Sequence, residues 1–347
     1  MSAKIGCDMH KKYSVFSKID ENGVISDSSK VYHNNGQLEQ FLENLPDGSE
    51  VAVEASGGWY KVIDAMEEAG LDPKLTNPHR AKLMMGNVDK TDKLDAEGLA
   101  LLLANGTLPE VSIPTKEVRD KRELLRCRMH LVGKRTSFKN RIHATLDKYG
   151  LKISAKDLFG ENGQEELQNR LNELPPQHQF TTKLQLELVD RITKQVEKIT
   201  ERAREVLKES SKVKKLKTIP GVGTILSAVI KLEVGEVQRF AQAKNLASYS
   251  GTVPRIHASG GNVKHGKTKR NVNHYLKWAY AEAANTVSVY SQKWGDKHVG
   301  ELYNRLCKKK GHGIAVGAVS RHLAVATWNI LTKGVVYKDP KTGEKWS

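Results

Sequence analysis

The chain has 347 residues, which exceeds the usual size of one domain, so we expect two or three domains with sizeable hydrophobic cores. Its 56 Lys and Arg residues outnumber 40 Asp and Glu residues. The formal charge of +16 favours a polyanionic partner such as nucleic acid, and a basic surface without a partner is the alternative. The three cysteines lie far apart, and there is neither a signal core nor a stretch near 20 apolar residues. These features argue against structural zinc and a membrane partner and predict a cytoplasmic location.

The first third of the sequence alternates strand and helix signals. We predict strands at residues 4–8 and 13–19, followed by a hairpin turn at Glu21-Asn22-Gly23 and a third strand at residues 24–26. The other elements predicted in this part are strands at 50–55 and 72–75 and helices at 37–45, 59–68 and 89–104, with one more opening at Asn77-Pro78. This order is typical of a mixed sheet flanked by helices, so the N-terminal part is assigned to the α/β class.

Four acidic residues stand where these elements begin or end. Asp8 and Glu54 each close a short apolar strand, and the carboxyl ends of strands meet at one edge of a sheet. Asp92 and Asp95 are three residues apart on a helix and share one face, although Asp92 alone is also a natural N-cap residue. Mg²⁺ prefers carboxylate ligands, and two such ions about 4 Å apart stabilise the charges of phosphodiester cleavage. We therefore predict that the four acids bind Mg²⁺, as two ions.

The middle of the chain is predicted to be helical. Residues 116–148 read as one long basic helix, which either faces phosphates or carries a solvated charged face. After Pro175-Pro176 comes a heptad-like seam made of Val189, Ile192, Val196, Ile199, Ala203 and Val206. This short pattern leaves two interpretations open, a helix that packs on its own chain or a helix that pairs with a second subunit.

A basic linker at residues 212–217 leads to a glycine turn at residues 219–223. Gly221 and Gly223 expose backbone N–H groups where a helix N-terminus favours an anion. The turn is therefore either a phosphate grip of the helix-hairpin-helix kind or a tight turn in which only glycine fits. The elements predicted after it are helices at 225–232, 241–250, 272–284 and 315–331, with a loop at 251–270.

The loop at residues 251–270 holds the second candidate for chemistry. Ser259 lies on it, and the cationic residues of the same loop are Arg255, Lys264, Lys267, Lys269 and Arg270. A serine hydroxyl on a mobile loop can reach a phosphorus atom while nearby cations stabilise the developing charge. Serine and glycine are also what flexible loops ordinarily contain, so a loop without chemistry is the alternative.

Three segments, spread over nearly the whole chain, carry a family resemblance. They are Lys90-Thr91-Asp92-Lys93-Leu94-Asp95-Ala96, Ile219-Pro220-Gly221-Val222-Gly223, and Ser250-Gly251-Thr252-Val253-Pro254-Arg255 leading to Ser259-Gly260. Together with the acids they resemble the DEDD transposases of bacterial insertion sequences, insertion-sequence family 110. The resemblance implies an RNase H-like, RuvC-like domain at residues 1–155, a helical coiled-coil connector for oligomerisation at 156–212, and a mostly helical transposase domain at 213–347.

The resemblance also implies a role for each site residue. The metal-binding acids of the family correspond to Asp8, Glu54, Asp92 and Asp95. The family's serine nucleophile corresponds to Ser259 and forms a phosphoserine link to DNA, while Ala258 stands where many relatives have a second serine. The implied protein is a recombinase that moves its own element, with donor and target DNA chosen by a structured non-coding guide RNA. We hypothesise a composite site in which the acids of one subunit meet Ser259 of another, in a dimer or tetramer.

Two other functions fit the same residues. A RuvC-like junction nuclease would use water as its nucleophile, and Ser259 would then only line a loop. A nucleic-acid-binding protein without enzymatic activity would use the four acids structurally. The nuclease keeps its cleavage activity without Ser259, and the binding protein has no metal-dependent cleavage to lose.

Overall fold

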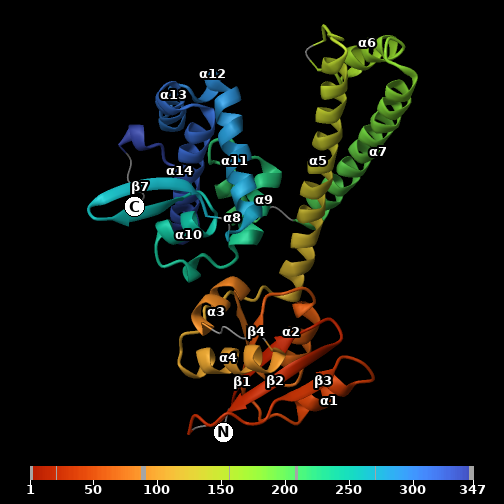
Figure 1. Cartoon of the computed structure of the whole chain (residues 1–347). Helices are drawn as coiled ribbons and strands as arrows, with labels where there is room; N and C mark the ends of the chain where they lie inside the picture. The colour runs from red at the N-terminus through yellow and green to blue at the C-terminus, as the bar shows by residue number, and fades with distance from the viewer. Residues whose placement is uncertain are drawn as a thin grey trace. The chain divides into compact units, whose positions relative to one another are not determined.

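The computed structural model describes residues 3–20, 22–86, 91–155, 157–207, 210–269 and 271–343. The chain divides into two compact units, Met1–Pro114 and Thr115–Ser347 (Figure 1). The first unit is α/β and the second is mostly helical, as the sequence predicts. The division falls after Pro114, because the long helix that follows it packs with helices of the second unit. The predicted domain boundary at residue 155 remains a prediction. The finer division of the second unit into a connector and a transposase domain remains a prediction.

The first unit is built on a mixed sheet with the strand order β3-β2-β1-β4-β5. Its strands are β1 (Lys4–Met9), β2 (Tyr13–Ile19), β3 (Ser29–Tyr32), β4 (Glu50–Glu54) and β5 (Asp72–Thr76). The pairs β1–β2 and β2–β3 are antiparallel, whereas β4 runs parallel to both β1 and β5. The carboxyl ends of β1, β4 and β5 therefore meet at one edge. Except for β3, the strands lie where the sequence predicts them.

The third strand was predicted at residues 24–26, and that prediction is wrong. Within this segment Ile25 forms an isolated bridge with Ile19, and the strand itself begins at Ser29. The side chain of Asp20 accepts hydrogen bonds from the N–H groups of Asn22 and Val24, which closes the turn locally. A side chain that captures backbone donors in this way competes with strand pairing. Glu21 of the predicted turn lies outside the described residues.

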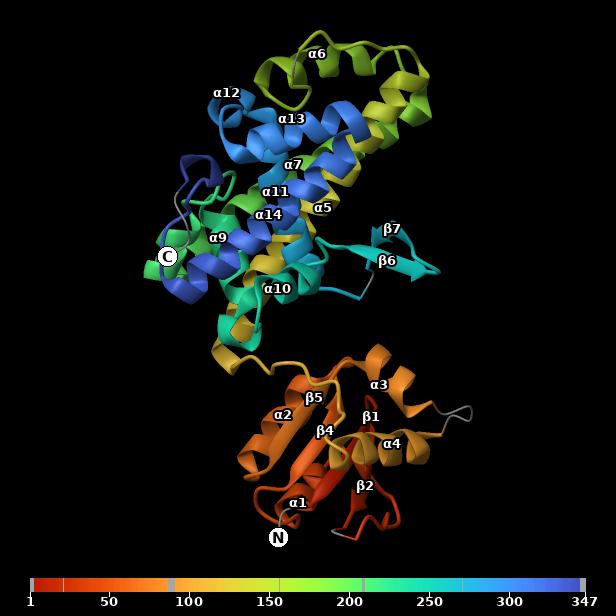
Figure 2. The same cartoon turned by 90° about the vertical axis from the view of Figure 1, so that its left-hand side faces the viewer.

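Helices cover both faces of the sheet (Figure 2). One face carries α1 (Gln37–Glu43) and α2 (Trp59–Glu68), whose buried side chains pack on Cys7 and Val53. The other face carries α4 (Asp92–Ala104), which packs with α3 (Pro78–Met85) on Ala52. Alternate residues of a strand point to opposite faces, so neighbouring positions of β1 and β4 serve different helices.

Gly6 allows α4 to lie unusually close to β1. A Cβ atom on Gly6 would be 1.9 Å from the carbonyl oxygen of Ala96 and 2.5 Å from the backbone nitrogen of Ala100. Both atoms belong to the backbone of α4, so a larger residue at position 6 would have to displace the helix. This close approach sets the distance between α4 and the sheet, and with it the position of the first turn of α4.

The second unit begins with a helical hairpin. The long helix α5 (Lys116–Lys148) has the predicted bounds, and α7 (Pro176–Val206) begins at the predicted proline pair and runs beside it (Figure 1). The shorter helix α6 (Glu161–Leu171) connects them, and it was not predicted. Its residues Leu167 and Leu171 pack with Ile142 and Leu146 of α5 in one apolar cluster.

The heptad-like seam of α7 faces its own chain. Val189, Val196 and Ala203 are buried where α7 packs on α5. This is the first of the two interpretations that the sequence left open. Pairing of two subunits through another surface remains a prediction.

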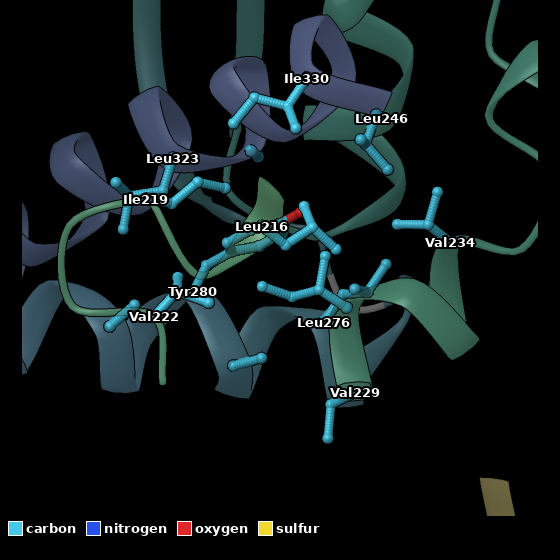
Figure 3. Packing of buried hydrophobic residues seen from close by; sticks show 14 of the residues in the cluster. Leu216, Ile219, Val222, Val229, Val234, Leu246, Leu276, Tyr280, Leu323 and Ile330 are labelled. Carbon is cyan, nitrogen blue, oxygen red and sulfur yellow. The ribbon is translucent and has the colours of Figure 1, made fainter. Parts of the chain in front are cut away.

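The rest of the second unit is a helical body with one β-hairpin. Its elements are α8 (Ser211–Leu216), α9 (Thr224–Val234), η1 (Val237–Arg239), α10 (Ala243–Tyr249), β6 (Pro254–Ser259), β7 (Asn262–Thr268), α11 (His274–Val289), α12 (Ser291–Trp294), α13 (His298–Lys310), α14 (His312–Lys333) and η2 (Pro340–Thr342). Figure 3 shows its core, in which Leu216 and Ile219 lie near Tyr280 of α11 and Leu323 of α14. These four core residues are almost fully buried.

Two predictions for this body are wrong. The predicted basic linker at 212–217 is largely the helix α8, which Ser210 caps by accepting a hydrogen bond from the backbone of Val213. The predicted loop at 251–270 contains the antiparallel hairpin β6–β7, which projects from the helices of this unit (Figure 2). Its tip is the pair Gly260-Gly261, and both glycines have positive φ, as a two-residue hairpin turn requires.

Helix α14 contradicts the expectation that no segment is apolar and long enough to cross a bilayer. It passes that test of length and composition, and it is the one helix of the described residues that does. Half of the tested window is buried, and Val319, Leu323 and Ile330 belong to the core of the second unit. A helix surrounded by other helices is apolar on most of its faces, which accounts for this composition.

Candidate metal and nucleic-acid site

Asp8 and Glu54 lie side by side at the carboxyl edge of the sheet. The last registered pair of the parallel strands β1 and β4 is Cys7 with Val53, and the two acids follow at the next position. Asp8 lies two residues after Gly6 and Glu54 two residues after Ala52, so both acids are on the sheet face that α4 covers. Each acid is only partly buried. The sheet therefore presents two carboxylates beneath the start of α4.

Asp92 and Asp95 lie in the first turn of α4. Thr91, not Asp92, is the N-cap residue, because its Oγ1 accepts a hydrogen bond of 3.2 Å from the backbone of Leu94. The carboxylate of Asp92 is therefore not committed to capping. Asp95 lies near enough to Asp8 for its charge to raise the pKa of the Asp8 carboxyl. Lys90, the first residue of the motif, lies outside the described residues.

His10 joins this group, and the sequence analysis missed it. Its Nε2 atom is 3.0 Å from Asp8 Oδ2 and 3.2 Å from Asp92 Oδ1. Tyr13 donates a hydrogen bond of 2.9 Å to Asp92 Oδ2. The ligand atoms of Asp8, His10 and Asp92 all lie within 4.8 Å of one another, in the one such group found among the described residues. The available signal was a histidine two residues after an acid that closes a strand.

The two linked carboxylates have opposite pKa shifts. Burial raises the pKa of Asp8 above its usual value, and the charges of Asp95 and Asp92 raise it further, against a lowering effect of His10. The hydrogen bond from Tyr13 is the main cause of a lowered pKa at Asp92. Asp92 is therefore easily ionised, whereas burial and the neighbouring acids disfavour the ionised form of Asp8. A cation between the two carboxylates would favour that ionised form, so this cluster could bind a metal.

Ser259 lies in the second unit, at the exposed tip of the β6–β7 hairpin. It pairs with Asn262 across the glycine turn. Arg255, Lys264 and Lys269 of the same segment are exposed as well. Lys267 belongs to β7, but its side chain and the whole of Arg270 lie outside the described residues. The hairpin thus carries an exposed hydroxyl together with exposed cations.

An ion pair with a buried carboxylate anchors the segment that follows this hairpin. Both Oε atoms of Glu233, on α9, accept hydrogen bonds from the Arg126 guanidinium of α5, at 2.8 and 2.9 Å. Asn273, the N-cap residue of α11, donates to Glu233 Oε2 at 2.9 Å. Glu233 therefore joins α5, α9 and α11 at one point. No sequence pattern indicated this role, because the three elements are far apart along the chain.

The two glycines of the turn before α9 have different surroundings. Gly221 has φ of 76°, and a Cβ atom there would be 2.1 Å from the carbonyl oxygen of Ala283. Its position therefore fits the interpretation of a tight turn in which only glycine fits. Gly223 has open space around it and directly precedes the first turn of α9. A phosphate grip at that helix end remains a prediction.

Comparison with known proteins gives two family matches. A family described as "Transposase", the DEDD transposases of IS110, matches residues 5–151. The family described as "Transposase IS116/IS110/IS902 family" matches residues 213–299. The first match contains Asp8, Glu54, Asp92 and Asp95, and the second contains Ser259.

Similar curated proteins extend over nearly the whole chain. The transposase for insertion sequence element IS1111A of Coxiella burnetii is 27% identical over 340 residues, which cover 96% of this chain and 91% of the relative. The transposase for IS1328 of Yersinia enterocolitica is 24% identical, covering 87% and 89%. A probable family 20 transposase of Pseudomonas aeruginosa is 21% identical, covering 97% and 98%.

The family matches and the relatives support a transposase, a class of enzyme that cuts and rejoins DNA. The two matches and the relatives together support the IS110/IS116 family of transposases. The same matches support DNA as a partner, and the matched DEDD family implies dependence on a divalent metal.

Proposed function

We propose that this chain is a recombinase that uses two Mg²⁺ ions, held by the acids of its first unit, and Ser259 as its nucleophile. The observation that carries the metal part is the convergence of Asp8 and Asp92 at the carboxyl edge of the sheet. The strand order of the first unit, with one antiparallel and one parallel neighbour for β1, supports an RNase H-like, RuvC-like fold.

The donor set suits a hard divalent cation. Asp8, Glu54, Asp92 and Asp95 would hold it, and carboxylates with water are what Mg²⁺ prefers. The raised pKa of Asp8 supports this assignment, because burial and the charges of Asp95 and Asp92 disfavour its ionised form, which a bound cation would favour. When bound, the metal would stabilise negative charge on the phosphate and lower the pKa of a hydroxyl near it.

Ser259 would attack a DNA phosphate. Its Oγ would form a bond to phosphorus, the bond from phosphorus to one DNA oxygen would break, and that strand would leave as a free hydroxyl. The serine proton passes to solvent or to the leaving oxygen. Attack of a DNA hydroxyl on the phosphoserine would rejoin a strand and restore Ser259. Exposed Arg255, Lys264 and Lys269 put positive charge on the same hairpin segment as the hydroxyl, which favours binding of the phosphate.

Three further predictions rest on the family resemblance. They are a structured guide RNA that selects donor and target DNA, a dimer or tetramer, and a composite site shared between subunits. The net charge of +16 is compatible with binding two kinds of nucleic acid.

The test is covalent trapping on DNA that carries the ends of the element. With Mg²⁺, we expect the unaltered protein to form a denaturant-resistant protein–DNA adduct, and mass spectrometry to locate it on Ser259. Ser259→Ala should abolish the adduct, whereas Ser248→Ala in α10 serves as a matched control that keeps it. Adduct formation by Ser259→Ala would rule this serine out. Cleavage without any adduct in either protein would favour the junction nuclease, in which water attacks.

The metal part is tested by replacing one acid. Asp8→Asn should lower metal-dependent cleavage by about 100-fold or more while DNA binding stays unchanged, because even indirect disturbance of a metal site costs about 10- to 100-fold. The control is Asp72→Asn, an exposed acid at the start of β5 and hence at the opposite edge of the sheet. Equal cleavage by both variants would rule Asp8 out as a metal ligand, whereas a lack of metal-dependent cleavage by the unaltered protein would favour a binding protein whose acids are structural.

A further inference from the structure

His10 is the member of the first-unit cluster that the acidic pattern does not account for. It directly follows β1, and its side chain is partly exposed. Its Nε2 atom faces two carboxylates at once, those of Asp8 and Asp92. A ring nitrogen in that position is either a donor that ties the two acids together or a third ligand for a cation.

The distances fit a ligand shell. Ligands on adjacent corners of an octahedron with bonds of about 2.1 Å lie about 3 Å apart. The Nε2 atom of His10 is 3.0 Å from Asp8 Oδ2 and 3.2 Å from Asp92 Oδ1. One nitrogen and two oxygens are thus spaced so that a single cation can contact all three.

Tyr13 holds two of these ligands in place. Its ring lies against that of His10, with the ring centroids 4.7 Å apart, and its hydroxyl donates to Asp92. The ammonium group of Lys30, on β3, lies 3.9 Å from the centroid of the Tyr13 ring. Ligands oriented by packing and hydrogen bonds lose little freedom when a metal binds.

We propose that His10 is a direct nitrogen ligand of the divalent cation that Asp8 and Asp92 hold, and that it biases this site toward Mn²⁺ over Mg²⁺. The inference rests on the metal site of the proposed function. Imidazole nitrogen suits transition metals, whereas Mg²⁺ strongly prefers oxygen. Loss of His10 should therefore weaken Mn²⁺ binding more than Mg²⁺ binding.

The first experiment needs no substitution. The full-length protein is loaded with MnCl₂ and examined by pulsed electron paramagnetic resonance, which detects nitrogen bound directly to Mn²⁺. We expect a nitrogen coupling that changes when the protein is produced with ¹⁵N-labelled histidine. Mn²⁺ that binds without such a coupling overturns the inference, and it leaves the acidic metal site intact.

The second experiment assigns the coupling to one residue. His10→Gln should remove the coupling and weaken Mn²⁺ binding at least about 10-fold, with a smaller effect on Mg²⁺ measured by calorimetry. His33→Gln is the matched control. His33 contacts Ser14 Oγ at 2.8 Å, and Ser14 points to the opposite sheet face from Asp8. This control should keep both the coupling and the affinity.

The outcomes separate the inference from the proposed function. If His10→Gln binds Mn²⁺ as tightly as the unaltered protein, or more tightly, His10 is only a donor to the two acids, and the inference is overturned. If the unaltered protein binds Mn²⁺ no better than Asp8→Asn, the metal site itself is absent, and the proposed function fails with it.

Discussion

At the scale of single residues, the first unit keeps like charges close together. Asp8 is partly buried beside Asp92 and Asp95, and its pKa is raised by burial and by those neighbours. A sequence optimised only for stability would avoid this arrangement, because uncompensated carboxylates destabilise the fold. Carboxylates with pKa values shifted by burial and by like charges are typical of functional sites. The acids are therefore better explained by a cation than by a structural role.

A second titratable residue predicts how stability depends on pH. Burial lowers the pKa of His322 to about 4, with a further contribution from the neighbouring His298. The unfolded chain takes up a proton near pH 6.5, whereas folded His322 does not until about pH 4. Stability should thus be lost as pH falls from about 6.5 to 4, by about 2 kcal/mol at pH 5.

Urea unfolding at pH 7 and pH 5 measures this loss. His322→Gln has no such proton to take up, so its stability should fall by about 2 kcal/mol less than that of the unaltered protein over the same interval. Equal losses in the two proteins would show that other groups cause the pH dependence.

At the scale of elements, the approach of α4 to β1 decides where the acids meet. Gly6→Ala places a Cβ against the backbone of α4, and we expect a loss of about 2 kcal/mol or more in the stability of the first unit. Hydrogen exchange of the α4 amides measures this change locally. Gly57→Ala, at a glycine with open space around it and an ordinary φ, should leave the exchange nearly unchanged. Equal effects would mean that the close approach is unimportant.

In the second unit, the buried carboxylate of Glu233 holds three helices, α5, α9 and α11, together at one point. Glu233→Ala removes the acceptor that Arg126 and Asn273 share, which should cost about 3 kcal/mol and increase hydrogen exchange at the start of α11. Glu236→Ala is the matched control, because Glu236 is 80% exposed and its pairing with Lys212 spans 3.9 Å. We expect the control to change stability by about 0.5 kcal/mol or less. The idea of an anchor is contradicted if both variants unfold alike.

At the scale of the whole molecule, the sequence predicts local elements well but does not predict contacts between residues that are far apart along the chain. The strand β1, which carries Asp8, and the helix α5 follow from local sequence patterns within a few residues, and both were predicted with nearly correct bounds. The hairpin that carries Ser259 was read as a loop, because its glycine and lysine content hides the pairing of β6 with β7. His10 and Glu233 were missed because their partners come from other elements. Such juxtapositions depend on packing, which a single sequence does not display.

The central claim is that acids scattered over the first hundred residues form one cation site. A crystal of the full-length protein soaked in MnCl₂ tests it most directly, because anomalous scattering locates Mn²⁺ independently of the protein density. We expect an anomalous peak in contact with the carboxylates of Asp8 and Asp92, at the carboxyl edge of the sheet. Well-ordered carboxylates with no peak between them at saturating Mn²⁺, or a peak only elsewhere in the chain, would contradict the account.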